Sequence, residues 1–400
     1  MKKNNYLPTN QCVILAGGYG SRLGDITKKT PKPLLKINNR FFIEYIIDSL
    51  ERQGIKNFLI FTWFKSFHFK KLKKRPGIKI HILKEKNKLG TGGGLVYFKK
   101  FLLNSFFVVN GDTFFDVNIR DLENITNSNN HLAGVSLAKS QKHQFKFEYS
   151  QDRNYKTTFY HKKKTPKFVS GGIYFFNKNF LNYKFHNNCD LDSDIIRFIY
   201  EKRKLTSKIY KNNFIDIGTP FFLKQAPKKI KLFTKKACCY LDRDGVINEY
   251  GNYIYKVNHF VWRKNVIDAI KFLNNNNYYV IIVTNQAGIG KGIYTLKNFY
   301  KLNEMMLSTI YKNGGYVDKI YFSPHYKYST IKKYRNGAFL RKPKPGMFFQ
   351  SFKDFNIIKS KSFLIGDQHS DILAGRKAAI KSYFVRPDIY NQVKKIISSI

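Results

Sequence analysis

Short apolar runs recur along this chain, and segments with helical spacing lie between them. The first half contains five such runs: CVILA (12–16), FLIFTWF (58–64), KIHIL (79–83), FFVVNGD (106–112) and GVSLA (134–138). The segment FFIEYIIDSLERQG (41–54), between the first two, has helical spacing and a closing glycine. This alternation of strand and helix predicts a mainly parallel sheet with helices on its faces.

The same order restarts after the polar, basic segment APKKIKLFTKKA (226–237). Four further strands are expected at CCYLD (238–242), YYVIIVTNQ (278–286), KIYFSPH (319–325) and SFLIGD (362–367), with helices near 265–276 and 296–315. A chain of 400 residues accommodates two domains. We therefore expect two Rossmann-like, three-layer α/β/α domains with mainly parallel sheets, at 1–225 and 237–400, joined by a linker at 226–236.

The chain is strongly basic, with 72 Lys and Arg against 26 Asp and Glu and a net charge of +46. These cations are scattered over the whole length, and no finger, RNP-type or basic-zipper motif accompanies them. We therefore expect anionic phosphates rather than nucleic acid as partners. A nucleic-acid binder, the alternative, would show a steep dependence of affinity on salt.

The cysteines Cys12, Cys189, Cys238 and Cys239 lack the spacing of a metal site. They are expected to be reduced structural residues, with the adjacent pair facing opposite sides of a strand. The first residues lack the apolar core of a signal peptide, and no run is long enough to span a membrane. The sequence predicts a cytoplasmic enzyme without a membrane partner and leaves homo-oligomerisation open.

In the first half, LAGGYGSRLGDITKKTPKPLLKI (15–37) reads as a strand that enters a glycine-rich loop. It is not a Walker loop, and Leu23 stands where a dinucleotide fingerprint needs its third glycine. The segment offers a backbone cradle and two cations for phosphates: Gly17, Gly18, Gly20, Arg22 and Lys32. A surface turn beside a basic stretch is the alternative interpretation.

AGGYGSRL with PKP is followed by LGTGGG (89–94), VNGDTFFD (109–116), SGGIYFF (170–176) and FIDIGTP (214–220). Together these segments resemble the sugar-1-phosphate nucleotidyltransferases, and most closely the heptose-1-phosphate guanylyltransferases. The resemblance implies that a sugar phosphate oxygen attacks the α-phosphorus of GTP and that pyrophosphate leaves. Its implied site residues are Gly17, Gly18 and Arg22 for the nucleotide, Lys32 for the reacting phosphates, Gly92 and Gly93 for base and ribose, and Asp112 and Asp216 for Mg²⁺.

One departure concerns the sugar. Many relatives carry a Glu-Lys pair before the SGGIY-type stretch, whereas FYHKKKTPKF (159–168) has lysines but no acid. The sugar contacts, and so the identity of the sugar, are left open by the sequence.

In the second half, YLDRDGVIN (240–248) places Asp242 and Asp244 two residues apart, so they converge on one side of a strand end. Two like charges at close range are costly unless a cation or a chemical task holds them. One aspartate can attack a phosphoryl group while the other carries a proton to the leaving alcohol. Three later segments supply further polar groups: VTNQAG (283–288) a hydroxyl and an amide, RKPKPG (341–346) cations, and LIGDQHSD (364–371) carboxylates.

These four motifs resemble the haloacid dehalogenase superfamily of phosphatases. The resemblance makes Asp242 the nucleophile and metal ligand, and Asp244 the general acid/base, with a metal contact through its carbonyl oxygen. Its other implied roles are Thr284 and Lys342 on the transferring phosphoryl group, Asn285 and Arg341 on the substrate, and Asp367 on Mg²⁺. Asp371 could assist there or simply cap or pair within a helix.

The finer match is to the heptose 1,7-bisphosphate phosphatases and their histidinol-phosphatase cousins, over 237–388. Many members carry a structural zinc site before the RKP motif, but of its ligands only His325 remains in SPH (323–325) and AFL (338–340). We predict no zinc, and the loop 323–341 must then be held by other means.

Both resemblances lie in one pathway, because the phosphatase product would be the guanylyltransferase substrate. The sequence thus predicts a bifunctional, Mg²⁺-dependent enzyme of activated-heptose synthesis for surface polysaccharide. One alternative is a transferase for a mannose- or glucose-like sugar 1-phosphate, joined to a phosphatase for another small phosphate. Another is that one domain is a non-catalytic sensor or binding module.

Overall fold

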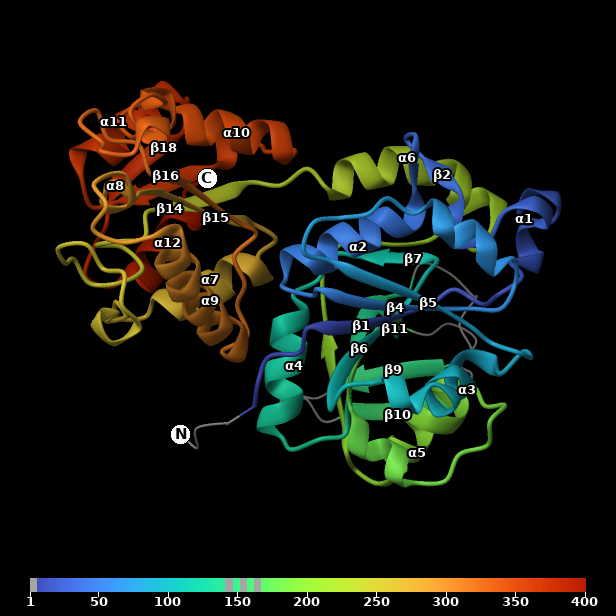
Figure 1. Cartoon of the computed structure of the whole chain (residues 1–400). Helices are drawn as coiled ribbons and strands as arrows, with labels where there is room; N and C mark the ends of the chain where they lie inside the picture. Colours follow the sequence, from blue (N-terminus) through green and yellow to red (C-terminus); the bar gives the residue numbers. More distant parts are fainter. Residues whose placement is uncertain (1–5, 141–146, 152–156, 162–166) are drawn as a thin grey trace. The chain divides into compact units, whose positions relative to one another are not determined.

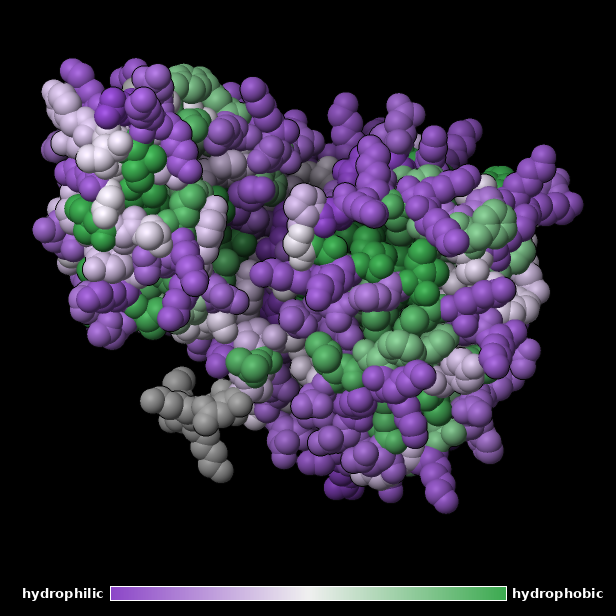
Figure 2. Space-filling model, in the orientation of Figure 1, coloured by the Kyte–Doolittle hydropathy of each residue, from purple (hydrophilic) through white to green (hydrophobic). Residues whose placement is uncertain are grey.

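The computed structural model describes residues 6–140, 147–151, 157–161 and 167–400. Its backbone divides into two compact units, Met1–Lys231 and Leu232–Ile400 (Figure 1). No helix among the described residues has the length and apolarity needed to cross a membrane. On the visible face, hydrophilic side chains are spread over both units rather than gathered in one stripe (Figure 2).

Unit 1 is built on a seven-stranded sheet with the order β12-β8-β11-β6-β1-β4-β5. Its strands are β1 (Gln11–Leu15), β4 (Asn57–Thr62), β5 (Lys79–Lys84), β6 (Ser105–Asn110), β8 (Ala133–Lys139), β11 (Phe168–Asn177) and β12 (Leu205–Ile209). Neighbours pair in parallel except at β11, which is antiparallel to both β6 and β8. Three two-stranded ladders accompany this sheet: β2 (Lys36–Ile37) with β3 (Arg40–Phe41), β7 (Thr113–Phe115) with β13 (Phe214–Asp216), and β9 (Phe147–Gln151) with β10 (Thr157–His161).

Helices cover both faces of this sheet. Since successive strand residues point to opposite sides, neighbouring residues of one strand pack against different helices. The helices are α1 (Asp25–Lys29), α2 (Phe42–Arg52), α3 (Gly90–Tyr97), α4 (Ile119–Ser128), α5 (Arg197–Glu201) and α6 (Pro220–Phe233). Val108 of β6 joins the core cluster that contains Leu95 of α3 and Ile199 of α5. The next residue, Val109, instead lines a small cavity with Leu50 of α2.

Unit 2 has a five-stranded, fully parallel sheet with the order β16-β15-β14-β17-β18. Its strands are β14 (Cys238–Leu241), β15 (Tyr279–Asn285), β16 (Lys319–Ser323), β17 (Phe363–Gly366) and β18 (Lys381–Phe384). Its helices are α7 (Val266–Asn275), α8 (Ala287–Gly290), α9 (Leu296–Lys312), α10 (Gly346–Asp354), α11 (His369–Lys377) and α12 (Ile389–Ser398). The expected α/β class with mainly parallel sheets is confirmed in both units.

The two faces of this second sheet have separate cores. Cys239 packs in a cluster with residues of α7, α9 and α12, whereas Cys238 packs with residues of α10 and α11. The adjacent cysteines therefore face opposite sides of β14, and each is a buried thiol. This arrangement produces the three layers that the strand and helix order predicted.

The segment expected as a linker, 226–236, lies mostly within α6, and the division between the units follows Lys231. Pro227 lies inside this helix. The functional boundaries at 225 and 237 stay a prediction.

Candidate active sites

The ends of three neighbouring strands carry the polar residues of the second unit. Asp242 follows β14, Thr284 lies near the end of β15, and Asp367 follows β17. Leu241 pairs with Ile282 on one side and with Ile365 on the other, so these strand ends lie next to one another. Parallel strands present their carboxyl ends at one edge of a sheet, which is where α/β proteins bind ligands. The structure thus brings together residues that lie 125 positions apart in sequence, from Asp242 to Asp367.

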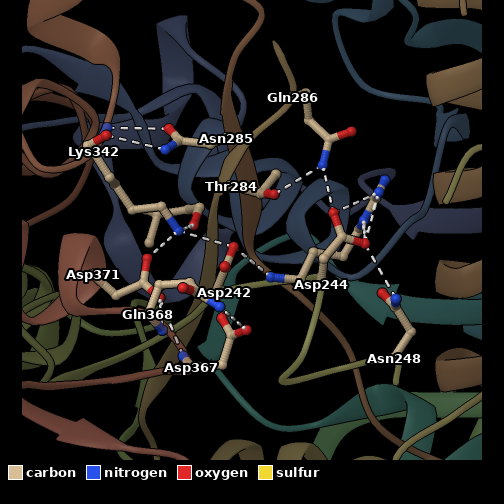
Figure 3. Close-up of polar contacts among 12 residues, drawn as sticks. Asp242, Asp244, Asn248, Thr284, Asn285, Gln286, Lys342, Asp367, Gln368 and Asp371 are labelled. Carbon is tan, nitrogen blue, oxygen red and sulfur yellow. Dashed lines mark hydrogen bonds and ion pairs between the residues drawn. The ribbon is translucent and has the colours of Figure 1, made fainter. Parts of the chain in front are cut away.

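Lys342 lies between two carboxylates at this edge (Figure 3). Its Nζ is 2.9 Å from Asp242 Oδ1 and 2.6 Å from Asp371 Oδ1, and it donates to the carbonyl oxygen of Val283 at 2.8 Å. Burial raises the pKa of Asp242 to about 7, against the opposing effect of Lys342, and the nearby Asp371 and Asp244 raise it further. The site therefore favours a cation at Asp242, which would return this carboxyl group to its ionised form.

Three carboxylates form a group that suits such a cation. Asp242, Asp367 and Asp371 each offer an oxygen, and these oxygens lie within 4.8 Å of one another. Asp367 Oδ1 is buried and has no hydrogen-bond partner among the described residues, and burial raises the pKa of this carboxyl group. Hard cations such as Mg²⁺ prefer carboxylate oxygens, so the donor set fits the expected metal.

Gly245 allows Asp367 to approach the loop after β14. Its φ is +82°, and a Cβ atom here would lie only 2.3 Å from Asp367 Oδ2. A side chain at this position would thus displace one of the candidate metal ligands.

Asp371, whose role the sequence left open, caps a helix and forms an ion pair, and its assistance at the metal site stays a prediction. Its Oδ2 accepts the backbone N–H groups of Asp367 at 3.1 Å and Gln368 at 3.0 Å, at the start of α11. Its Oδ1 pairs with Lys342. The residue therefore caps a helix and belongs to the charged centre at once.

Asp244 is turned toward a different set of partners. Arg243 donates to it from Nε at 3.1 Å and from Nη2 at 2.9 Å, Asn248 Nδ2 donates at 3.1 Å and Gln286 Nε2 at 3.0 Å. Gln286 also donates to Thr284 Oγ1 at 2.9 Å (Figure 3). Its Oε1 accepts from Tyr294 Oη at 2.5 Å. Sequence reasoning missed the positioning by Arg243, Asn248 and Gln286, although all three lie within the quoted motifs. The metal contact predicted for the carbonyl oxygen of Asp244 stays a prediction.

Asn285 is engaged with the backbone of Lys342. Its Oδ1 accepts the N–H of Lys342 at 3.1 Å, and its Nδ2 donates to the carbonyl oxygen of the same residue at 3.1 Å. This double contact fixes the RKPKPG segment against the end of β15. Asn285 therefore positions Lys342, and its predicted contact with substrate stays a prediction.

A pocket of about 290 Å³ is lined by the four aspartates of this site and by Asn285, Arg341 and Lys342. The loop 323–341 beside it is held by packing and hydrogen bonds. Tyr334 is buried in a cluster with Ile289, Tyr294 and Phe299. The ring of His325 lies 6.2 Å from that of Tyr334 and against Gly337, where a Cβ atom would lie 2.3 Å from it.

In the first unit, the glycine-rich loop follows β1. Gly20 has a φ of +70° and lies against Thr27, whose Oγ1 donates to the Gly20 carbonyl at 3.0 Å. Gly18 is exposed, with open space where a side chain would be. Gly17 lies beside Trp63, and Glu85 Oε1 is 3.8 Å from the position of its Cβ atom. The conformation of this loop therefore depends on glycine at position 20, and its backbone is exposed at Gly18.

The predicted cations and acids of this unit converge. Lys32 is buried and its Nζ lies 2.5 Å from Asp112 Oδ2. A Cβ atom on Gly218 would lie 2.6 Å from Asp216 Oδ1, 3.0 Å from Arg22 Nη2 and 3.3 Å from Lys32 Nζ, so these three side chains meet at one glycine.

Burial raises the pKa of Asp216 to about 6, and Asp112 adds to this effect while Lys32 and Arg22 oppose it. Two carboxylates beside two cations suit a Mg²⁺ ion that is bound together with substrate phosphates.

Gly92 and Gly93 pack against protein rather than facing an open pocket. They are buried, and both backbone N–H groups donate to the carbonyl oxygen of Cys189, at 2.9 and 3.1 Å. A Cβ atom on Gly93 would lie 2.0 Å from the carbonyl oxygen of Asn187. Close packing therefore explains these glycines, and their contact with base and ribose stays a prediction. The segment 159–168, expected near the sugar, lies partly outside the described residues.

Comparison with known proteins gives a match to each unit. The family described as "Nucleotidyl transferase" matches residues 11–231, and the family described as "Polynucleotide kinase 3 phosphatase" matches residues 243–392. A D-glycero-alpha-D-manno-heptose 1-phosphate guanylyltransferase of Campylobacter jejuni is 34% identical over 218 residues, which are 52% of this chain and 95% of the relative.

The second unit has relatives of its own. A D-glycero-alpha-D-manno-heptose-1,7-bisphosphate 7-phosphatase of Photorhabdus laumondii is 36% identical over 146 residues, 36% of this chain and 80% of the relative. A D-glycero-beta-D-manno-heptose-1,7-bisphosphate 7-phosphatase of Rhodopseudomonas palustris is 34% identical over 164 residues, 41% of this chain and 91% of the relative. The chain therefore belongs to the nucleotidyl transferase family in its first part and to the family of heptose-bisphosphate 7-phosphatases in its second.

Proposed function

We propose that this chain is a bifunctional enzyme of heptose activation. Its second unit would remove the 7-phosphate of D-glycero-D-manno-heptose 1,7-bisphosphate, and its first unit would transfer a guanylyl group from GTP to the resulting heptose 1-phosphate. One observation carries the proposal: the relatives of the two units are named for two reactions in which the product of one is the substrate of the other. The family description of the second unit mentions polynucleotides, but the 36% identity to a sugar phosphatase favours a small substrate.

In the phosphatase reaction, Asp242 attacks the phosphorus atom of the 7-phosphate. Its contacts with Lys342 and with the N–H of Arg243 both engage Oδ1, so Oδ2 is the oxygen that attacks. A bond forms between Oδ2 and phosphorus while the bond from phosphorus to the sugar oxygen breaks. Asp244 gives its proton to that oxygen and then takes one from the water that hydrolyses the aspartyl phosphate.

Lys342 and Thr284 stabilise the negative charge on the transferring phosphoryl group, while Asp367 and Asp371 complete the acidic group around Asp242. Enzymes of both families generally use a divalent metal ion, usually Mg²⁺. A bound Mg²⁺ would neutralise part of the charge on the phosphate, with Asp242 and Asp367 as its ligands in this unit and Asp112 and Asp216 in the other.

In the transferase reaction, a phosphate oxygen of the sugar 1-phosphate attacks the α-phosphorus of GTP and pyrophosphate leaves. Arg22 and Lys32 would hold the phosphates, and the exposed backbone at Gly18 could donate to them. The protein contributes position and charge, which supply most of the catalysis in phosphoryl transfer.

The test is one reaction, run separately with the α and β anomers of the heptose 1,7-bisphosphate. The purified protein receives the sugar, Mg²⁺ and an equal mixture of GTP, ATP, CTP and UTP, and products are identified by mass spectrometry. GDP-heptose with phosphate and pyrophosphate is the expected result, and an Asp242→Asn variant should form neither phosphate nor GDP-heptose from the bisphosphate. Release of phosphate without any nucleotide sugar would overturn the guanylyl step, and another nucleotide sugar would overturn the choice of GTP.

A further inference from the structure

One stretch of the first unit is much more basic than the rest of the chain. Residues 65–79, KSFHFKKLKKRPGIK, contain seven Lys and Arg and no Asp or Glu, whereas the whole chain has 72 Lys and Arg in 400 residues. This stretch, which we call the basic segment, connects β4 to β5. None of its residues belongs to either candidate active site.

The local structure turns the charged side chains of the basic segment outward. Residues Ser66–Lys71 form a 3₁₀ helix, in which side chains three positions apart lie on the same side. Phe69 is 1% exposed and packs inward, whereas Phe67 is 64% exposed and shares its side of the helix with Lys70, which is also exposed. The segment exposes three further lysines: Lys71, Lys73 and Lys74. An apolar ring is therefore exposed to water among several ammonium groups.

Both ends of the basic segment are fixed to the rest of the unit. Lys65 has a left-handed φ of +49°, and its Nζ donates to the carbonyl oxygen of Lys28. At the other end, Arg75 Nη1 lies 2.5 Å from Asp48 Oδ1 and 2.9 Å from Glu51 Oε2, both on α2. The exposed lysines between these two contacts therefore belong to an ordered backbone.

The positive charge of the exposed lysines is not neutralised by the protein. Among the described residues, none of the four lysines between positions 70 and 74 forms an ion pair. Asp48 and Glu51, the acids of α2 beside the segment, are already engaged by its arginine. Desolvation lowers the pKa of His68, and the positive charges of Lys71 and Lys65 lower it further. The segment thus presents a net positive surface to an anionic partner.

We infer that the basic segment binds the surface of an anionic lipid bilayer, with the ring of Phe67 inserted among the head groups. Lysine ammonium groups are attracted to anionic head groups without a fixed geometry, and an apolar side chain beside them is stabilised at the boundary with the acyl chains. Arg75 could hold the phosphate of a nucleic acid through two N–H groups, but it is already engaged with two acids. The free cations are all lysines, and together with the exposed ring they favour a bilayer over a nucleic acid.

This inference goes beyond the two proposed reactions and does not depend on them. It departs from the expectation of no membrane partner, which rested on the absence of a run long enough to span a bilayer. Peripheral binding requires only surface charge and a shallow apolar insertion, so it needs no spanning helix.

The test measures binding of the purified full chain to vesicles by co-sedimentation at physiological ionic strength. One set of vesicles is phosphatidylcholine alone, and the other is equal parts of phosphatidylcholine and phosphatidylglycerol. We expect binding to the anionic vesicles only, and added salt should weaken it. Replacement of Lys70 and Lys71 together by glutamine should raise the dissociation constant at least tenfold, because each cation near such a surface contributes roughly a factor of five. Phe67→Ser should raise it at least threefold.

The matched control replaces Lys332 and Lys333 together by glutamine. It removes the same charge from another 3₁₀ helix with two adjacent exposed lysines, and it should bind like the unaltered protein. Tyr300→Ser, at a ring of α9 that is 56% exposed, is the control for Phe67→Ser and should also bind normally. Thermal unfolding verifies that each variant is folded.

Three results would overturn the inference. If the unaltered protein does not bind anionic vesicles, the surface has no affinity for a bilayer. An equal loss in the Lys332 and Lys333 control, or a loss of less than threefold in the Lys70 and Lys71 variant, would show that overall charge rather than the basic segment is responsible. Binding to single-stranded RNA but not to vesicles, with the same loss in the Lys70 and Lys71 variant, would assign the segment to a nucleic acid instead.

Discussion

Lys342 Nζ lies 2.9 Å from Asp242 Oδ1, and the same ammonium group lies 2.6 Å from Asp371. All three residues are buried. One ammonium group thus offsets the negative charge of two buried carboxylates that water solvates poorly. The stability of this group of charges therefore depends on Lys342. Asn285 fixes the backbone of Lys342, so the position of the ammonium group is set by β15 as well as by its own loop.

Replacement of Lys342 by methionine should abolish phosphate release and destabilise the second unit. The volume is similar, but two buried carboxylates lose their partner, a change that typically costs about 3–5 kcal/mol. A domain of this size would then melt about 10 °C lower. Because the pKa of Asp242 is raised to about 7, protonation of this carboxyl group at pH 5 removes its repulsion from Asp371, and part of the lost stability should return. The measurement is thermal unfolding at pH 5 and pH 8, followed by Trp262 in a Trp63→Phe background.

Lys344→Met is the matched control, since Lys344 lies two residues further along the same segment and is exposed. It should keep both activity and melting temperature. An equal loss of stability in this control, or no loss in Lys342→Met, would contradict the compensating role of Lys342.

Replacement of Asp367 by asparagine should weaken the response to Mg²⁺. This substitution removes one charge from the group of three carboxylates but keeps the shape of the side chain and its contact with Gln368. We expect the Mg²⁺ concentration for half-maximal phosphate release to rise at least tenfold, measured by titration of the metal at saturating substrate. Asp268→Asn, at an exposed residue of α7, should leave this concentration unaltered; an identical titration for Asp367→Asn and the unaltered protein would exclude Asp367 as a ligand.

The sequence was sufficient to predict which strand-end residues of the second unit lie close together, because parallel strands present their carboxyl ends at one edge. Once β14, β15 and β17 were placed, Asp242, Thr284 and Asp367 had to lie near one another. The two faces of β14 followed equally from the alternation of side chains along a strand.

Other features depend on contacts that no local pattern contains. The antiparallel β11 between β8 and β6 results from pairing between distant segments. The engagement of Asp244 by Gln286, and the packing of Gly93 against Asn187, likewise join residues far apart in sequence. The segment at 226–236 looked like a linker because it is polar and contains Pro227, yet α6 continues through this proline.

Replacement of Lys32 by methionine should reduce guanylyl transfer at least a hundredfold. The ammonium group of Lys32 is buried at Asp112 and lies close to Arg22 and Asp216, where the phosphates are proposed to react. Loss of a fixed positive charge at such a centre typically costs about 10²–10³ in rate. The measurement is pyrophosphate release from GTP and heptose 1-phosphate, with Lys36→Met, at an exposed lysine of β2, as the control. A rate for Lys32→Met within threefold of the control would contradict the proposed role.

The carboxyl group of Glu85 makes the stability of the first unit depend on pH. Glu85 is 6% exposed, and burial raises its pKa from the ordinary 4.5 to about 7, although the N–H of Leu89 opposes this shift. Between pH 4.5 and 7 the unfolded chain therefore releases this proton while the folded chain retains it. It follows that the contribution of Glu85 to the free energy of unfolding falls as the pH rises through this window.

Glu85→Gln removes this dependence because the amide stays neutral and can still accept from Leu89. Relative to the unaltered protein, the variant should gain about 2–3 kcal/mol between pH 5 and pH 8. Unfolding by urea is followed through Trp63 in a Trp262→Phe background, so that the fluorescence reports the first unit. Glu201→Gln, at an exposed carboxylate, should show the same difference from the parent at both pH values. If Glu85→Gln behaves like Glu201→Gln, the carboxyl group of Glu85 is ionised at pH 5 and its environment is not the one described.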